Sequence, residues 1–240
     1  MKRLLIITLL GFGIWSLGFG EAFADRRSYV WTYEYMTMPK GMAEVEYYNT
    51  LEYADANTPK VSTWKHLFEY EYGITDRWDI SMYQQFKQTN TAAANTLSYD
   101  GYKIRTRYRI GERNSLPIDT LLYLEYIGKN DLSALNQAEI KLILAKDIGR
   151  FNIAYNQILK QTLNSGGATE HEYAAGMHLE FSPALKIGIE GKGNYSAGSH
   201  YVGPTISVAT DKFWANFGIL KGLTSNANYI QSRFLMGIHI

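Results

Sequence analysis

The stretch that decides the fold is Tyr102-Lys103-Ile104-Arg105-Thr106-Arg107-Tyr108-Arg109-Ile110. Apolar and basic side chains alternate in it, and a period of two places successive side chains on opposite faces of a β-strand. One face is therefore apolar and the other carries the cations. A soluble protein would bury the apolar face in a dry core, whereas a membrane barrel would turn it toward lipid and keep the cations in the lumen.

The same alternation runs through most of the chain after Gly41. It predicts an all-β, closed, antiparallel up-and-down transmembrane barrel of about 12 strands, an even number that is typical of bacterial single-chain barrels. The expected strands cover residues 43–53, 64–72, 78–86, 102–110, 118–127, 137–146, 151–160, 171–181, 185–193, 201–209, 213–221 and 229–240.

The predicted connections alternate in length. Short turns fall at 75–77, 148–150, 182–184 and 210–212, with a longer one at 111–117, and polar loops fall at 54–61, 88–100, 128–136, 161–170, 194–200 and 222–228. Short periplasmic turns and longer outer loops are typical of membrane barrels. This alternation, the export signal described next and a chain that ends inside a strand favour the membrane barrel over a soluble one.

The N-terminus has the pattern of an export signal. Lys2 and Arg3 precede an apolar run over residues 4–15, and Ala22-Phe23-Ala24 offers the small-x-small pattern of a cleavage site. The run is short for a membrane anchor. We therefore predict a signal peptide over residues 1–24 and a barrel over residues 41–240 in the bacterial outer membrane. Residues 25–40 are expected to be a periplasmic extension or a segment folded into the barrel mouth.

Composition narrows the function classes. The chain has no cysteine, which excludes disulfides and thiolate metal sites. Its formal net charge is +1 and its basic residues are not clustered in a loop, so we expect no nucleic-acid partner. No cofactor or metal site is predicted. The 19 Tyr, 10 Phe and 5 Trp are an aromatic excess that suits membrane interfaces.

Charged positions on the expected lumen face are the candidate selectivity residues: Lys103, Arg105, Arg107, Arg109, Glu44, Glu46, Glu69, Glu71, Asp79 and Arg233. Further lumen-facing candidates are Glu52, Glu125, Glu139, Lys141, Glu172, Glu180, Glu190 and Lys192. Two interpretations stay open: an acidic wall facing a basic wall across an open, ion-selective lumen, or charges that pair and fill a barrel of intermediate width. On the last strand, Arg233 is expected to close against Glu44 and Glu46 on the first.

Catalysis is not expected. A lipid hydrolase of the outer membrane would need a serine nucleophile beside a histidine base. The histidines are His66, His171, His178, His200 and His239, and none stands in a His-x-Ser arrangement. Ser199-His200 is the only adjacent pair. Each histidine is therefore expected to be an interface or loop residue.

Several stretches resemble a known group of proteins. Tyr29-Val30-Trp31-Thr32-Tyr33-Glu34, Met38-Pro39-Lys40-Gly41 and Glu44-Val45-Glu46 look like the opening of a family of outer-membrane barrels. The stretch from Tyr72 to Ile80, Tyr-Gly-Ile-Thr-Asp-Arg-Trp-Asp-Ile, is similar to a hairpin of the transporter-like barrels grouped with the phenol meta-cleavage pathway proteins. The resemblance covers mainly residues 29–86 and implies an outer-membrane barrel with a transport role, without assigning site residues.

The last strand also resembles the signal read by the barrel-assembly machinery. Ile230, Phe234, Met236, Ile238 and Ile240 occupy alternate positions, with Ser232 as a polar exception and Ile240 in place of the usual terminal Phe. This resemblance implies the assembly machinery and outer-membrane lipid as partners.

The function expected from these observations is an outer-membrane channel, similar to a porin, for small charged or aromatic solutes. The alternatives are a structural or adhesion barrel with a plugged lumen and, after it, an outer-membrane lipid hydrolase.

Overall fold

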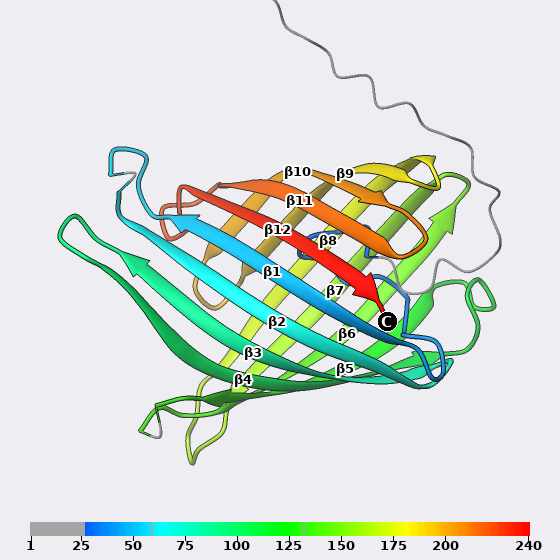
Figure 1. Cartoon of the computed structure of the whole chain (residues 1–240), viewed down its shortest axis with the longest axis horizontal. Coiled ribbons are helices and arrows are strands. Elements are labelled where there is room, and N and C mark those ends of the chain that lie inside the picture. Colours follow the sequence, from blue (N-terminus) through cyan, green and yellow to red (C-terminus); the bar gives the residue numbers. More distant parts are fainter. Residues whose placement is uncertain (1–26, 59, 132) are drawn as a thin grey trace, which may run out of the picture.

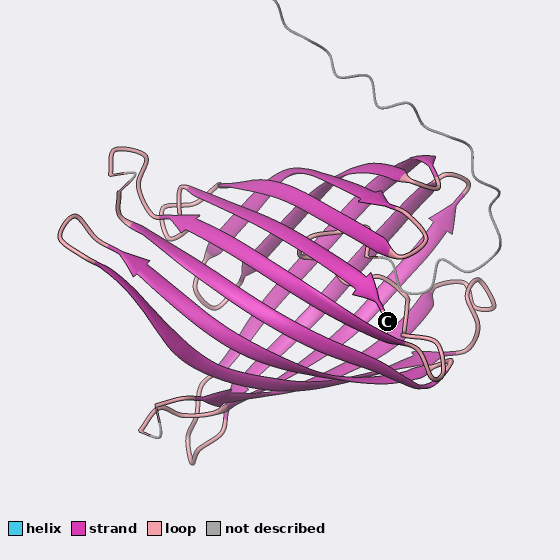
Figure 2. Ribbon diagram, in the orientation of Figure 1, coloured by secondary structure: helices cyan, strands magenta, loops and turns pink. Residues whose placement is uncertain are grey.

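A computed structural model describes residues 27–240 except Pro59 and Leu132. Within these residues the chain forms one closed barrel of twelve strands, drawn as arrows in Figures 1 and 2. No helix in this part of the chain is long and apolar enough to cross a membrane. The closed all-β barrel confirms the predicted fold class. The predicted signal peptide, residues 1–24, lies outside the described residues.

The strands follow one another around the barrel in chain order. Their bounds are β1 Ala43–Tyr53, β2 Ser62–Thr75, β3 Trp78–Asn90, β4 Asn95–Ile110, β5 Asp119–Lys129, β6 Gln137–Ile148, β7 Phe151–Thr162, β8 Thr169–Ser182, β9 Leu185–Asn194, β10 Ser199–Ala209, β11 Phe213–Gly222 and β12 Ile230–His239. Each is antiparallel to its neighbours, and β1 pairs with β12 to close the ring.

The register of the closing pair corrects one prediction. Arg233 lies opposite Thr50, while Glu44 lies opposite His239 and Glu46 opposite Gly237. Arg233 therefore lies well along the strand from both glutamates. Its Nε donates a hydrogen bond to Thr50 Oγ1 at 2.7 Å. The predicted contact with Glu44 and Glu46 was wrong because alternation fixes the face of a strand but not its register.

The two faces of the strands divide as the membrane-barrel prediction states. On β4, Ile104 is 45% exposed and Tyr108 is 49% exposed, whereas Arg105 and Arg107 are each 1% exposed. The apolar face therefore points out of the barrel and the charged face points in. Exposed outward aromatic rings include Trp78, Tyr108, Phe151 and Phe181, all in strands close to the short turns.

Connections define the two ends of the barrel. Residues 76–77, 149–150, 183–184 and 210–212 are short turns at one end, which we name the turn side; the opposite end is the loop side. One predicted loop, 88–100, is wrong in its bounds. β3 continues to Asn90 and β4 begins at Asn95, where the two residues are paired. These strand ends are polar, so their composition is typical of a loop although their backbones form a ladder.

Candidate functional site

The chain ahead of β1 lies inside the barrel. Residues 27–38, named here the lumen segment, are drawn in dark blue within the ring of strands in Figure 1. Tyr29, Val30 and Met38 are fully buried. The segment joins β1 from the turn side, where the Gly41 amide donates to the Gly73 carbonyl at 2.8 Å. The middle of the lumen is therefore occupied by the protein's own chain.

Glu190 on β9 holds the middle of the lumen segment. Its Oε1 accepts a hydrogen bond from the Val30 amide at 2.6 Å, and its Oε2 accepts from the Trp31 and Thr32 amides at 2.8 and 2.7 Å. Backbone amides that are buried outside a sheet need acceptors, and a carboxylate is a strong one. One wall carboxylate thus satisfies three successive amides.

Wall asparagines satisfy further backbone groups of the segment. Asn156 on β7 accepts from the Tyr33 amide at 2.6 Å and donates to the Tyr33 carbonyl at 2.9 Å. Asn216 on β11 donates to the Arg27 carbonyl at 2.8 Å. A side-chain amide offers both a donor and an acceptor, so it can replace a neighbouring strand for an irregular backbone.

A buried carboxylate of the segment faces a wall histidine. Glu34 Oε1 lies 3.3 Å from His178 Nε2, and Glu34 Oε2 accepts from the Ser28 amide at 2.6 Å. Burial alone would raise the pKa of Glu34, but the hydrogen bonds from His178 and Ser28 and the charge of Lys186 outweigh it and lower the pKa to about 2. Glu34 is therefore a buried anion.

His178 departs from the expectation for the histidines. It is 4% exposed on the inner face of β8 and is neither an interface nor a loop residue. The adjacent pair Ser199 and His200 begins β10, and His200 Nδ1 lies 3.2 Å from the Tyr173 hydroxyl. The hydrogen-bond partner of that ring nitrogen is thus a tyrosine.

Two wall glycines make room for aromatic rings of the segment. A Cβ at Gly176 would lie 2.6 Å from Tyr29 Cε1, and one at Gly218 would lie 2.7 Å from Trp31 Cζ3. Real Cβ atoms do not approach so closely, so larger residues at either position would displace the segment. The Tyr29 hydroxyl donates to Asn152 at its carbonyl, 2.9 Å away.

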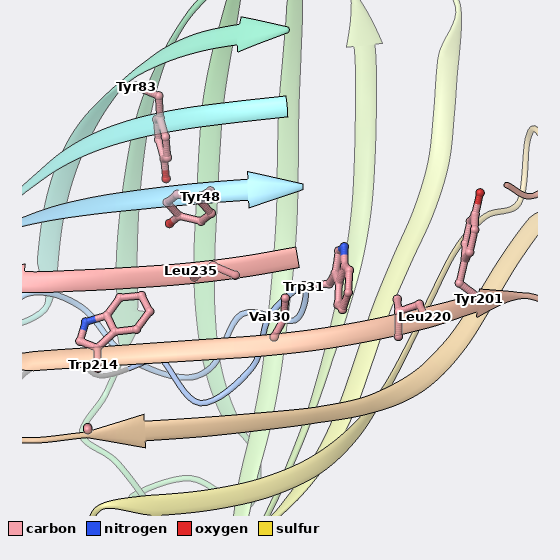
Figure 3. Packing of buried hydrophobic residues seen from close by; sticks show 9 residues of the cluster. Val30, Trp31, Tyr48, Tyr83, Tyr201, Trp214, Leu220 and Leu235 are labelled. Carbon is pink, nitrogen blue, oxygen red and sulfur yellow. The ribbon is translucent and has the colours of Figure 1, made fainter. Parts of the chain in front are cut away.

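Apolar side chains of the lumen pack on both sides of the segment. Figure 3 shows Val30 and Trp31 beside β11, which carries Leu220, with Leu235 on the neighbouring β12 and Tyr48 and Tyr83 farther along the wall on β1 and β3. A second cluster consists of Tyr29, Tyr33, Tyr35, Leu121, Tyr123, Ile143, Ala145 and Ala154. The burial of these rings stabilises the segment inside the barrel.

The predicted basic ladder is divided among three environments. Arg105 and Arg107 join Glu69, Glu71 and Asp79 in a buried ionic cluster on β2, β3 and β4. Arg105 Nη1 lies 3.0 Å from Glu69 Oε1, and Arg107 Nη2 lies 2.7 Å from Asp79 Oδ2. This pairing favours the interpretation in which the charges fill the barrel.

The remaining ladder residues lie beyond the ionic cluster, on its two sides. Lys103 pairs with Glu125 at 2.8 Å toward the loop side. Arg109 donates to the Asp76 carbonyl at the turn side. The predicted acidic residues of β1 also find separate partners: Glu44 accepts from the Trp214 indole, and Glu46 accepts from the Tyr48 hydroxyl at 2.6 Å.

Two cavities lie on either side of the lumen segment. The turn-side cavity, of about 620 Å³, is lined by Glu34–Thr37 of the segment and by Arg109, Arg113 and Asp147 of the wall, among others. The loop-side cavity, of about 490 Å³, is lined by Arg27, Trp31 and Tyr33 of the segment together with wall residues such as Lys192 and Arg233. The segment therefore separates two chambers of one lumen.

Sequence reasoning placed Glu190 and Lys192 in the lumen but missed Asn156, Asn216, Gly176 and Gly218. Their residue types are ordinary for a strand, and only the position of the segment gives them a role. The alternating aromatic residues Tyr29, Trp31, Tyr33 and Tyr35 were the available signal for the segment. They have the period of a strand, but a thirteenth strand would have made the strand number odd, which indicated that this stretch lies outside the barrel wall.

No protein-family model and no curated protein matches the chain. Solved structures do match it. A KdgM porin in complex with disordered oligogalacturonate aligns with a TM-score of 0.54 and 8% identity, over 82% of this chain and 97% of the porin. A NanC porin aligns with a TM-score of 0.55 and 8% identity, over 82% of this chain and 98% of the porin. The resemblance to the phenol meta-cleavage group is not confirmed by these comparisons, which show that the chain has the fold of outer-membrane barrel porins.

Proposed function

We propose that the protein is an outer-membrane channel for small solutes and that the lumen segment closes it in the conformation described here. The observation that carries the proposal is the position of the segment between two chambers of about 620 and 490 Å³. A barrel built only as a scaffold needs no such chambers. Passage then requires the segment to leave its wall contacts or to shift within the lumen.

The outer face of the barrel supports a membrane location. Its exposed side chains are largely aliphatic and aromatic, as on β4 and β5, where Ile104, Leu122 and Leu124 point outward. Such a surface suits outer-membrane lipid. In this proposal the predicted signal peptide exports the chain and the last strand is read by the barrel-assembly machinery.

The channel is tested by single-channel recording in planar bilayers. We compare the full mature chain with a variant that lacks residues 25–38, and we expect the deletion to raise the conductance several-fold because it joins the two chambers. A deletion of Asn164–Gly167, in the loop between β7 and β8, is the matched control and should leave the conductance unchanged. Absence of current from every form would refute the channel; equal current from the full chain and the 25–38 deletion would refute closure by the segment.

One observation favours the second candidate, a plugged structural or adhesion barrel. The segment is bound by three amide contacts to Glu190 and by the two contacts of Asn156, which suits a permanent plug. This candidate predicts that the deletion variant conducts whereas the full chain stays closed at all voltages.

A further inference from the structure

The loop-side cavity contains more cations than its carboxylates can neutralise. Its acidic residues are already paired with lysines of the same cavity: Glu52 with Lys65 at 2.8 Å, Glu125 with Lys103 at 2.8 Å, Glu139 with Lys141 at 2.9 Å and with Lys160 at 3.3 Å, and Glu172 with Lys160 at 3.2 Å. Lys192 and Arg233 line the same cavity. Among the described residues, neither has a carboxylate within ion-pair distance.

Lys192 on β9 and Arg233 on β12 both lie near the ring of Trp31. Lys192 Nζ lies 5.8 Å from the centre of the Trp31 ring, and Arg233 Cζ lies 5.4 Å from it. Lys192 Nζ also lies 5.4 Å from the Tyr201 ring. Arg233 donates hydrogen bonds to two neutral oxygens, Thr50 Oγ1 at 2.7 Å and the Val30 carbonyl at 3.4 Å. Cation–π contacts are weaker than an ion pair, so both cations can still bind an anion.

The walls of the cavity also restrict the kind of ligand that fits it. Trp31, Tyr173 and Tyr201 line it beside the two cations. Flat aromatic walls favour a ligand that carries a ring, and a cavity of about 490 Å³ has the volume of a small-molecule site.

We propose that the loop-side cavity binds a small carboxylate that carries a ring, with the carboxylate at Lys192 and Arg233 and the ring against the aromatic wall. That this ligand is a transported solute rests on the proposed channel function, whereas binding itself does not. Because Trp31 belongs to the lumen segment, the ligand contacts both the wall and the segment that closes the lumen.

Binding is measured with the refolded full mature chain in detergent, by the change in tryptophan fluorescence and by calorimetry. Benzoate is the probe, with benzylammonium as its cationic counterpart and sodium chloride as a ring-free anion control. We expect benzoate to bind, benzylammonium not to bind, and chloride to compete only weakly. Lys192→Gln should weaken benzoate about tenfold or more, the effect of losing one charge-assisted contact.

Two further variants are controls for this test. Lys221→Gln makes the same substitution on an outward-facing residue of β11, where the lysine lies over the Tyr229 ring at 5.9 Å, and should leave binding unchanged. Lys192→Arg keeps the charge and should retain most of the affinity. Heat-modifiable migration in gels verifies that each variant is folded.

Two results would overturn the site: no benzoate binding by the folded wild type, or equal binding by wild type and Lys192→Gln. If Lys192→Gln does not fold, the test is the comparison of benzoate with benzylammonium on the wild type, and equal binding of the two would overturn the site. A protein that conducts without binding benzoate refutes this site alone, and one that binds benzoate without passing current refutes the channel alone.

Discussion

The two halves of the barrel wall use their lumen-facing side chains in different ways. On β2, β3 and β4 these side chains are long and charged, and they fill their part of the lumen by pairing with one another. On β7, β8, β9 and β11 they include two asparagines, two glycines, His178 and Glu190, which contact the lumen segment. The first half therefore pairs most of its charges within the wall and meets the segment mainly where Asp79 accepts from the Met38 amide at 3.0 Å, whereas the second half finds its hydrogen-bond partners in the segment.

The largest effect should come from breaking the ionic cluster. Arg107→Gln would leave Glu71 and Asp79 buried with too little positive charge, which costs about 3–5 kcal/mol of the free energy of unfolding. The midpoint of heat-modifiable migration in urea measures it. Arg109→Gln is the control, because Arg109 contacts the Asp76 carbonyl at the exposed turn side and should change that midpoint little. An equal fall of the urea midpoint in both variants would contradict a larger contribution of Arg107 than of Arg109 to stability.

The second effect concerns release of the lumen segment. Glu190→Gln removes the charge that three amides share, a loss of about 1.5–3 kcal/mol of docking free energy, and each 1.4 kcal/mol raises the open fraction about tenfold. Bilayer recordings should show more frequent opening while the urea midpoint changes less than in Arg107→Gln. Glu172→Gln, whose carboxylate pairs with Lys160, should not open the lumen. An open probability of Glu190→Gln equal to that of the wild type would show that Glu190 does not hold the segment in the lumen.

A smaller effect should follow from filling the space that a wall glycine leaves. Gly176→Val would press on Tyr29 and cost about 1–3 kcal/mol of segment docking. We expect an increase in open probability below that of Glu190→Gln. Gly191→Val is the matched control, since a Cβ there meets only the Tyr201 carbonyl at 3.4 Å. Equal open probabilities of the two valine variants would contradict the role of Gly176 in admitting Tyr29.

The smallest effect is a pH dependence of segment docking through Glu34. Because the pKa of this carboxyl falls from an ordinary value of 4.5 to about 2 when the segment is docked, its contribution is complete above pH 4.5 and is lost as the pH falls toward 2. Between pH 8 and pH 5, Glu34 should not alter the open probability. Below pH 4.5, Glu34→Gln should respond less to acid than the wild type does, and an equal acid response would contradict this assignment.

The sequence predicts the barrel wall much better than its contents. Alternation along Tyr102–Ile110 placed Arg105 and Arg107 on the inner face, because the period of a strand is a local property. It could not pair Arg233 with Thr50, because register depends on how two distant strands meet. The extent of β3 and β4 was underestimated because their ends, at Asn90 and Asn95, are polar on both faces.

The lumen segment is hard to predict for a related reason. Its alternating tyrosines have the period of a strand, yet its amides bind Glu190 and Asn156 instead of a neighbouring strand. The space that admits it depends on Gly176 and Gly218, which belong to β8 and β11. Such a fit is a property of the assembled barrel and is absent from any single stretch of sequence.

The chain contains no cysteine, so an introduced pair would form a single defined disulfide. A Cβ at Gly218 would lie 3.1 Å from Val30 Cγ2 but also 2.7 Å from Trp31 Cζ3, so Val30→Cys and Gly218→Cys are combined with Trp31→Ala, which removes the second contact and lets the two cysteines bond. With Glu190→Gln added to loosen the segment, the oxidised protein should stay closed in a planar bilayer and conduct once a reductant is added to the same membrane. Current that is the same before and after verified reduction would contradict closure of the lumen by residues 27–38.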